Sequence, residues 1–165
     1  WEDTRASSGF NFRMTELQGA VGLAQLRKLD FIVKMQNKNK KALEEAIKGN
    51  KHIKLREVPS GSYETADALV FTVKDKDSAL NIRRELLKEG ISTKILPEAT
   101  SWHFSATWTH MKELEVFHGK DLSNAFPISK KLLERAVSLP VKVNFDDDYL
   151  NKVRKAIDRA LYAMS

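Results

Sequence analysis

Apolar residues recur at helical spacing through much of the first third of the chain. Between Thr15 and Lys48 they fall at about every third or fourth position, which predicts a helix with one apolar face. Thr15 is suited to be the N-cap, Gln18 completes a capping box with it, and Gly49 supplies the stop. A single helix of this length would measure roughly 50 Å at about 1.5 Å per residue. We therefore expect it to break, near Leu29–Asp30, or to pack on a larger body.

The remainder of the chain alternates between strand-like and helical patterns. Strands are predicted at 53–58, 68–74 and 91–95, and helices at 78–89, 126–137 and 147–162. Residues 68–74 give the strongest strand signal because they are apolar and rich in β-branched and aromatic types. Pro140 cannot donate to a ladder, so 138–141 is interpreted as an extended edge segment. The prediction is one α/β domain of the α+β kind, with a small sheet covered by helices on one side.

Two segments add detail to this prediction. Gly90 follows the helix at 78–89 in the position where a left-handed residue is usual. Residues 97–123 form a long irregular segment rich in Trp and His, with a short helix predicted around 110–117. Long loops inside a compact domain are usually functional or are seen without their partner.

Composition narrows the class of protein. The 165 residues match one ordinary domain, and the absence of cysteine excludes disulfides and thiolate metal sites. No run of 18 or more apolar residues occurs, so we expect a soluble, cytoplasmic protein without a membrane partner. The net charge of +6 is dispersed along the chain. Its densest cluster, Lys34 to Lys41, is followed at once by Glu44 and Glu45, which favours a solvated helix face over a nucleic-acid surface.

The segment before Thr15 holds the first candidate chemistry. Asn11 and Arg13 alternate there with Phe10, Phe12 and Met14. In an extended conformation Asn11 and Arg13 point the same way, beside a helix N-terminus whose amides and dipole favour an anion. One interpretation is a contact to a phosphate or carboxylate. The other is a capped surface helix whose arginine makes an ordinary salt bridge.

Aromatic and histidine residues give the second candidate site. His103 lies between Trp102 and Phe104, and it is either a part-buried histidine or a histidine that lines a pocket. Trp102, Phe104 and Trp108 could stack on a sugar or a base, although core or interface packing is the alternative role. The histidine spacing in this segment matches no established ligand pattern. We therefore predict no metal site.

The opening motif also resembles a known family. The residues that carry the resemblance are Gly9, Asn11, Arg13, Met14, Glu16, Leu17, Gln18, Ala20, Gln25 and Leu26. In this order they resemble the start of the C-terminal part of the DegT/DnrJ/EryC1/StrS family of pyridoxal-phosphate-dependent sugar aminotransferases. Phe126–Pro127 and Arg135–Pro140 are similar to closing elements of that family. The segments Trp102–Phe104 and Thr107–Met111 most resemble its 8-amino-3,8-dideoxy-manno-octulosonate transaminase subgroup.

The resemblance implies a fold and an activity. The fold is the C-terminal domain of the type I aminotransferase fold, which works as a homodimer. The activity is amino transfer, with glutamate the usual donor, to a sugar or sugar nucleotide in surface polysaccharide or lipopolysaccharide biosynthesis. Residues 1–14 would form the interface and cofactor-contact segment, 15–48 a long linker helix and 49–165 the small α/β domain. The family's Schiff-base lysine lies upstream of this stretch, so no catalytic residue is expected in the chain and it is expected to be inactive alone.

The resemblance also assigns roles to single residues. Asn11 matches the asparagine that reaches across the dimer to the phosphate of pyridoxal 5'-phosphate, and Arg13 a neighbour that holds the anionic end of ligands. His103, with Trp102, falls where a Pro-Leu-His-like element contributes to the substrate site, although this chain has Thr100–Ser101 before them. Two other hypotheses stay open: a non-catalytic sugar-nucleotide or protein-binding module, and, ranked last, a nucleic-acid-binding domain.

Overall fold

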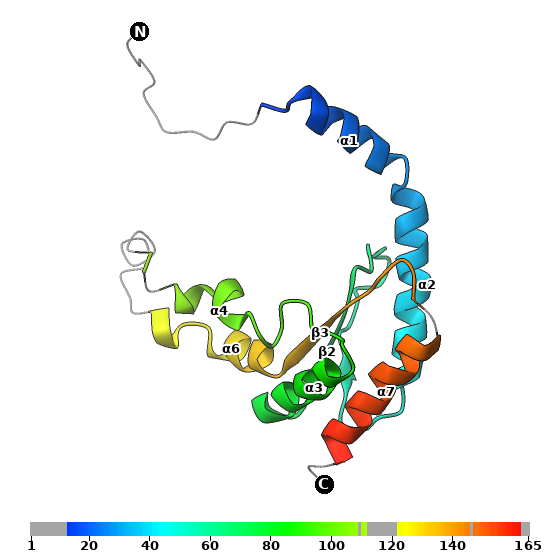
Figure 1. Cartoon of the computed structure of the whole chain (residues 1–165). Helices are drawn as coiled ribbons and strands as arrows, with labels where there is room; N and C mark the ends of the chain where they lie inside the picture. Colours follow the sequence, from blue (N-terminus) through cyan, green and yellow to red (C-terminus); the bar gives the residue numbers. More distant parts are fainter. Residues whose placement is uncertain (1–12, 109, 112–121, 146, 163–165) are drawn as a thin grey trace.

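The chain begins, in its described part, with a long helical arm. The computed structural model describes residues 13–108, 110–111, 122–145 and 147–162 (Figure 1). Helix α1 spans Glu16–Leu26, and α2 spans Leu29–Ile47. The predicted capping box is present: the Gln18 backbone N–H donates to Thr15 Oγ1 at 3.2 Å, and Thr15 N–H donates to Gln18 Oε1 at 2.9 Å. The chemistry of the cap therefore sets where the arm begins.

The helical stretch expected over 15–48 is two helices. The break falls at Arg27–Lys28, two residues before the expected Leu29–Asp30, and the Lys28 N–H donates to the Gln25 carbonyl three residues back. Figure 1 shows that α1 and α2 follow one curved path, with α1 extending away from the rest of the molecule. The break divides the long helix that was expected into two shorter ones, but α1 still extends beyond the body of the domain.

No residue of α1 is buried, although most of its residues are apolar. Glu16 is its one ionisable residue, and Leu17, Leu23 and Leu26 are 75%, 60% and 64% exposed. Several large apolar side chains exposed on one element mark a surface suited to an interaction. Among the described residues, none covers these leucines of α1.

The sheet has three antiparallel strands in the order β1-β2-β3. They are β1 (Lys54–Leu55), β2 (Ala68–Thr72) and β3 (Ala136–Pro140). Leu69 pairs with Leu139 and Phe71 with Val137. Since alternate residues share a face of a strand, these four side chains form one apolar surface, and each is at most 1% exposed.

Helices cover this face of the sheet, as predicted. Helix α3 (Lys76–Lys88), helix α7 (Asp147–Tyr162) and the second half of α2 pack together over it (Figure 1). Their buried residues share one core with the strands, including Leu43, Ile82 and Ile157. The expected fold class, a small sheet covered on one side, is confirmed.

The strand predicted at 91–95 is wrong. The segment does run beside β3, where the Lys94 N–H donates to the Ser138 carbonyl and the Ser138 N–H to the Leu96 carbonyl. However, Ile95 has φ +72°, a left-handed conformation that interrupts an extended chain and is rare for a β-branched residue. The third strand is instead β3, which includes the expected extended residues 138–140 but also Ala136 and Val137. The predicted helix over 126–137 is wrong at these two residues, because α6 ends at Glu134 and both residues pair with β2. Gly90, also at φ +72°, has the predicted left-handed conformation.

The segments that flank β3 and α3 form a second, smaller cluster. They are α4 (Thr100–His103), η1 (Ser105–Thr107), η2 (Leu122–Asn124) and α6 (Pro127–Glu134). Phe104, Ala106 and Leu122 are buried there, with Leu133 of α6 against them. Most of the short helix predicted around 110–117 lies outside the described residues.

Polar contacts fix α2 to the body. The Asn39 amide donates to the carbonyls of Lys142 at 2.9 Å and Val143 at 2.7 Å, and Asn39 itself is buried. Lys40 is buried as well and pairs with Glu64 and Glu44. The basic cluster at 34–41 is therefore not wholly a solvated face, because this lysine takes part in a buried network.

Candidate functional site

Two side chains that follow it in the sequence hold the turn that carries Trp102 and His103. Thr107 Oγ1 donates to the Ser101 carbonyl at 2.6 Å, and the Trp108 indole N–H donates to the same carbonyl at 3.1 Å. Phe104, next along the chain, is 5% exposed in the smaller cluster. Trp108 therefore fixes this loop, which agrees with the packing role considered for it.

Trp102 and His103 themselves face outward on α4. Trp102 is 75% exposed, and His103 is exposed beside it. The part-buried interpretation of His103 is therefore wrong, and no core role for Trp102 is seen in the described structure. A rigid turn that presents an indole and an imidazole to solvent can offer a stacking surface and a hydrogen-bonding group to a ligand.

Glu98 ties this turn to helix α3, a contact that the sequence did not predict. Thr93 Oγ1 donates to the Glu98 carboxylate, and Arg83 of α3 forms an ion pair with it. Burial by itself raises the pKa of Glu98, but the Thr93 hydrogen bond and the Arg83 charge outweigh burial and hold the pKa below its ordinary value. Arg83 lies on another element, α3, so no local pattern could have identified this ion pair.

Replacing Glu98 with Gln is expected to loosen the turn and to lower the free energy of unfolding by about 1 kcal/mol, because a charged hydrogen-bond acceptor is lost at a partly exposed site. The contribution of Glu98 is present above its unfolded-state pKa and is lost as the pH falls through its lowered folded-state pKa. Hydrogen exchange at the Ser101 and Trp102 amides measures the loosening. Glu57→Gln is the control, since Glu57 and Lys54 are both highly exposed; equal exchange in the two variants would contradict the tether.

The first candidate pair lies elsewhere. Arg13 is exposed and comes directly before the capped start of α1, whereas Asn11 lies outside the described residues. Figure 1 shows α1 at the far end of the arm, away from the sheet, α4 and α6. The structure therefore brings Trp102 and His103 together, but it leaves Arg13 apart from them.

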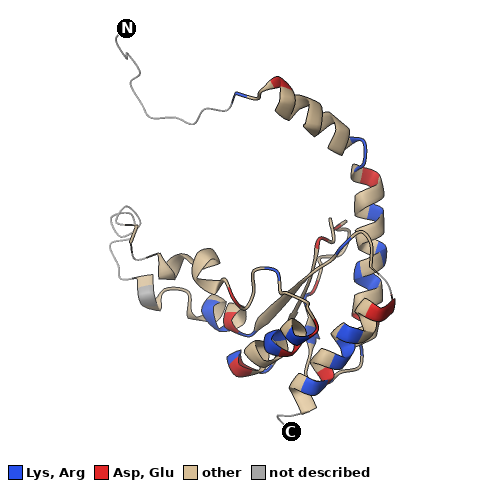
Figure 2. Cartoon of the chain, viewed as in Figure 1, with Lys and Arg blue, Asp and Glu red and all other residues tan. Residues whose placement is uncertain are grey.

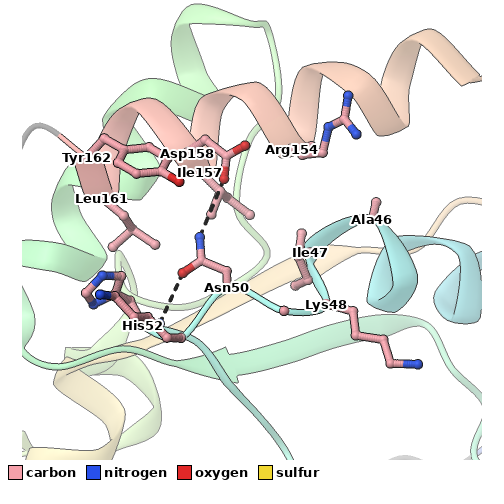
Figure 3. A pocket seen from close by; sticks show the side chains of 12 residues that line it. Ala46, Ile47, Lys48, Asn50, His52, Arg154, Ile157, Asp158, Leu161 and Tyr162 are labelled. Atoms are coloured by element: carbon pink, nitrogen blue, oxygen red, sulfur yellow. Dashed lines mark hydrogen bonds between the residues drawn. The ribbon is translucent and has the colours of Figure 1, made fainter.

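A hollow at the end of α2 provides a polar joint rather than a reactive site. It encloses about 360 Å³ between the end of α2 and the last turns of α7. Asn50 lies at its centre, donating to Asp158 Oδ1 at 3.5 Å and accepting from the His52 backbone N–H at 3.1 Å (Figure 3). Lys48 and Arg154 point away from Asn50 in this view. These contacts close the junction of two helices and bring no acid–base pair together.

Clusters of metal-ligating residues, membrane-length helices and the distribution of charge are the remaining features that the sequence predictions concern. Among them, no three His, Cys, Asp or Glu side chains gather closely enough to hold a metal ion. None of the described helices is both long and apolar enough to cross a membrane. Figure 2 shows Lys and Arg interleaved with Asp and Glu on α3 and α7, so neither helix presents a purely basic stripe.

Several solved structures of aminotransferases share this fold. The chain superposes on the PseC aminotransferase of Helicobacter pylori, involved in pseudoaminic acid biosynthesis, with a TM-score of 0.72 at 18% identity over 99% of this chain and 42% of that one. For the sugar aminotransferase CalS13 of Micromonospora echinospora, the TM-score is 0.69 at 20% identity, and the match covers 92% of this chain and 37% of that one. For the putative sugar aminotransferase Spr1654 of Streptococcus pneumoniae in its PLP form, it is 0.71 at 17% identity, over 100% and 40%.

These similarities define the fold of this chain as part of the pyridoxal-phosphate aminotransferase fold. The chain spans about two fifths of the length of these structures. The model of the DegT/DnrJ/EryC1/StrS aminotransferase family matches residues 1–158. The chain belongs to that family.

Proposed function

We propose that this chain is the C-terminal part of a pyridoxal-phosphate-dependent sugar aminotransferase. It would take part in transferring an amino group, with glutamate as donor, to a keto or aldehydo sugar in surface polysaccharide or lipopolysaccharide biosynthesis in the cytoplasm. The observation that carries the proposal is the family match over residues 1–158. The octulosonate subgroup remains the narrower proposal, supported by the Trp102–Phe104 and Thr107–Met111 motifs.

The residues before α1 suit the phosphate of the cofactor. An asparagine amide and an arginine guanidinium are hydrogen-bond donors, and the guanidinium adds positive charge, so Asn11 and Arg13 would hold a phosphate group. Arg13 is exposed where such a group could reach it. The bound cofactor supplies the electron sink that amino transfer needs. In a homodimer, this segment would contribute its donors to the partner subunit's cofactor.

The α4 turn would supply part of the sugar site. Sugar rings stack on exposed indole faces, and their hydroxyls take hydrogen bonds from imidazole groups. Trp102 and His103 are neighbours on a turn fixed by Trp108, Thr107 and Glu98. Such fixed geometry lowers the entropy lost when a ligand binds.

The exposed helix α1 would dock on the cofactor domain. The match covers 37–42% of the length of the solved structures, so those chains are about two and a half times as long as this one. The part of the fold beyond this chain would offer a surface for α1. Docking α1 would also place Arg13, which immediately precedes it, against the domain that carries the cofactor lysine.

Replacing Asn11 with Ala in the complete enzyme is expected to weaken pyridoxal-phosphate retention about tenfold, because a hydrogen bond to a charged group contributes about 1.5–3 kcal/mol. The fold should survive, since Asn11 precedes the capping box that starts α1. Cofactor absorbance after dialysis measures retention.

The matched control is Asn144→Ala, an exposed asparagine after β3. Unchanged retention in the Asn11 variant would refute the cofactor contact. Binding of sugar nucleotide without any cofactor binding would favour the non-catalytic module instead.

A further inference from the structure

A cavity of about 530 Å³ lies between the start of α3 and helix α6. We call it the α3–α6 groove and define it by Lys74, Lys76, Ile128, Lys131, Leu132 and Arg135. A second hollow of about 360 Å³, which reaches Ser101 of α4, shares Lys76 and Glu134 with it. The two hollows therefore follow one path between the helices.

The rim of the groove is positively charged. Lys74, Lys76 and Lys131 are exposed, and among the described residues none of the three has a carboxylate oxygen within 4 Å. Arg135 adds a fourth cation and is partly anchored by its hydrogen bond to the Val73 carbonyl at 3.3 Å. Four cations thus surround a space that contains few opposing charges.

Only two carboxylates line the same cavity, and one is engaged. Asp75 Oδ1 accepts from the Ser78 backbone N–H at 2.9 Å and from its hydroxyl at 2.7 Å. These two hydrogen bonds lower the pKa of Asp75, so it stays ionised as the cap of α3. Glu134 is the other carboxylate. The residues that line the cavity therefore carry more positive than negative charge.

The lining of the groove includes apolar side chains that are exposed in the described structure. Ile128 is 82% exposed and Leu132, four residues later on the same face of α6, is 47% exposed. The adjoining hollow adds Leu80 of α3, 41% exposed. A phosphate or a nucleic-acid backbone would satisfy the lysines but would leave these apolar side chains in water.

We propose that the α3–α6 groove docks an acidic amphipathic segment of a partner protein. Its apolar side chains would cover Ile128 and Leu132, while its carboxylates would meet Lys74, Lys76 and Lys131. This is the helix-in-groove mode of peptide recognition, and the complementary charges select acidic segments over basic ones. Because the groove continues to Ser101, a docked segment would also lie beside the α4 turn.

The test is a fluorescence-anisotropy titration of the full protein with a labelled peptide of about three helical turns, with Leu on one face and Glu on the other. This peptide should bind, whereas a Glu-only peptide and a Leu/Lys peptide should bind at least about tenfold more weakly. Ile128→Ser and Lys131→Glu should each weaken binding by about fivefold or more. The matched controls, Tyr63→Ser and Lys155→Glu, alter equally exposed residues elsewhere and should leave the affinity unchanged.

Three results would overturn the proposal. They are equal binding of the Glu-only peptide, unchanged affinity in both groove variants, and displacement of the peptide by inorganic pyrophosphate with all selectivity for Leu lost. The last result would assign the groove to a small anion. Circular dichroism confirms that each variant is folded, and the milder pair Ile128→Thr and Lys131→Ala repeats the test if either variant is not.

Discussion

Replacing Glu64 with Ala is expected to lower the free energy of unfolding by about 2 kcal/mol, because it removes the nearer carboxylate partner of the buried Lys40, although Glu64 itself is partly exposed. The Lys40 side chain is 8% exposed and forms its ion pair with Glu64; its other carboxylate neighbour, Glu44, lies 3.6 Å away. Without Glu64, a buried ammonium keeps only that longer contact. Arg56, which also pairs with Glu64, loses its partner too. Chemical denaturation of the wild type and variant measures the difference.

Two controls separate this effect from the general loss of a surface charge. Glu45→Ala breaks an exposed pair with Lys48 and should cost no more than about 0.5 kcal/mol. Lys40→Met combined with Glu64→Ala should recover most of the stability, since replacing both partners of a buried pair by apolar groups is often neutral. Equal losses in the Glu64 and Glu45 variants would contradict the buried-pair account.

The same pair predicts a dependence on pH. The Lys40 hydrogen bond, opposed by burial and aided by Arg56, lowers the pKa of Glu64. A lowered folded-state pKa means that this stabilisation is complete above the unfolded-state pKa and is lost as the pH falls through the folded value. The difference in stability between wild type and Glu64→Gln should therefore shrink in acid and stay constant near neutrality.

Introducing two charges on α1, with Leu17→Glu and Val21→Glu, is expected to weaken its docking on the cofactor domain by about a hundredfold or more. Each side chain gains about 1.5–3 kcal/mol on full burial, and a buried glutamate without a partner costs more. On the proposed function, the complete enzyme would lose assembly and activity together. In the 165-residue chain alone, the same variant should bind less of a hydrophobic dye, since Leu17 and Val21 are 75% and 53% exposed.

The control for this prediction is Tyr63→Glu. Tyr63 is 77% exposed in the loop before β2. The Tyr63→Glu variant therefore adds a surface glutamate without altering α1. Full activity in the α1 variant, measured beside this control by amino transfer and by sedimentation, would show that α1 does not dock.

Local chemistry explains what the sequence predicted well. The capping box at Thr15, the left-handed Gly90 and the acidic start of α7 each depend on residues within one turn of each other. The apolar residues of β2 mark a strand because they fit a pleated, buried surface. Patterns of this kind need no knowledge of the rest of the fold.

The errors and omissions arise from contacts between distant residues. Residues 91–95 have a strand-like composition, but the left-handed Ile95 and the pairing with Ser138 replace a regular ladder. The exposure of Trp102 depends on which residues pack beside it in the folded chain, and the spacing of residues along the sequence does not predict those contacts. The Arg83–Glu98 ion pair joins α3 to the candidate site, again across the chain. The roles of Asn11 and Arg13 in cofactor binding remain predictions.

The two-residue break between α1 and α2 is a point about which α1 can turn as a unit. Helix α1 has 11 residues, or roughly 16 Å at about 1.5 Å per residue, and no buried contact opposes its rotation about Arg27–Lys28. Turning it by about 10° would displace its far end by about 3 Å, the length of a hydrogen bond. On the proposed function, the surface that receives α1 would also set the position of Arg13, so cofactor binding and assembly would be coupled.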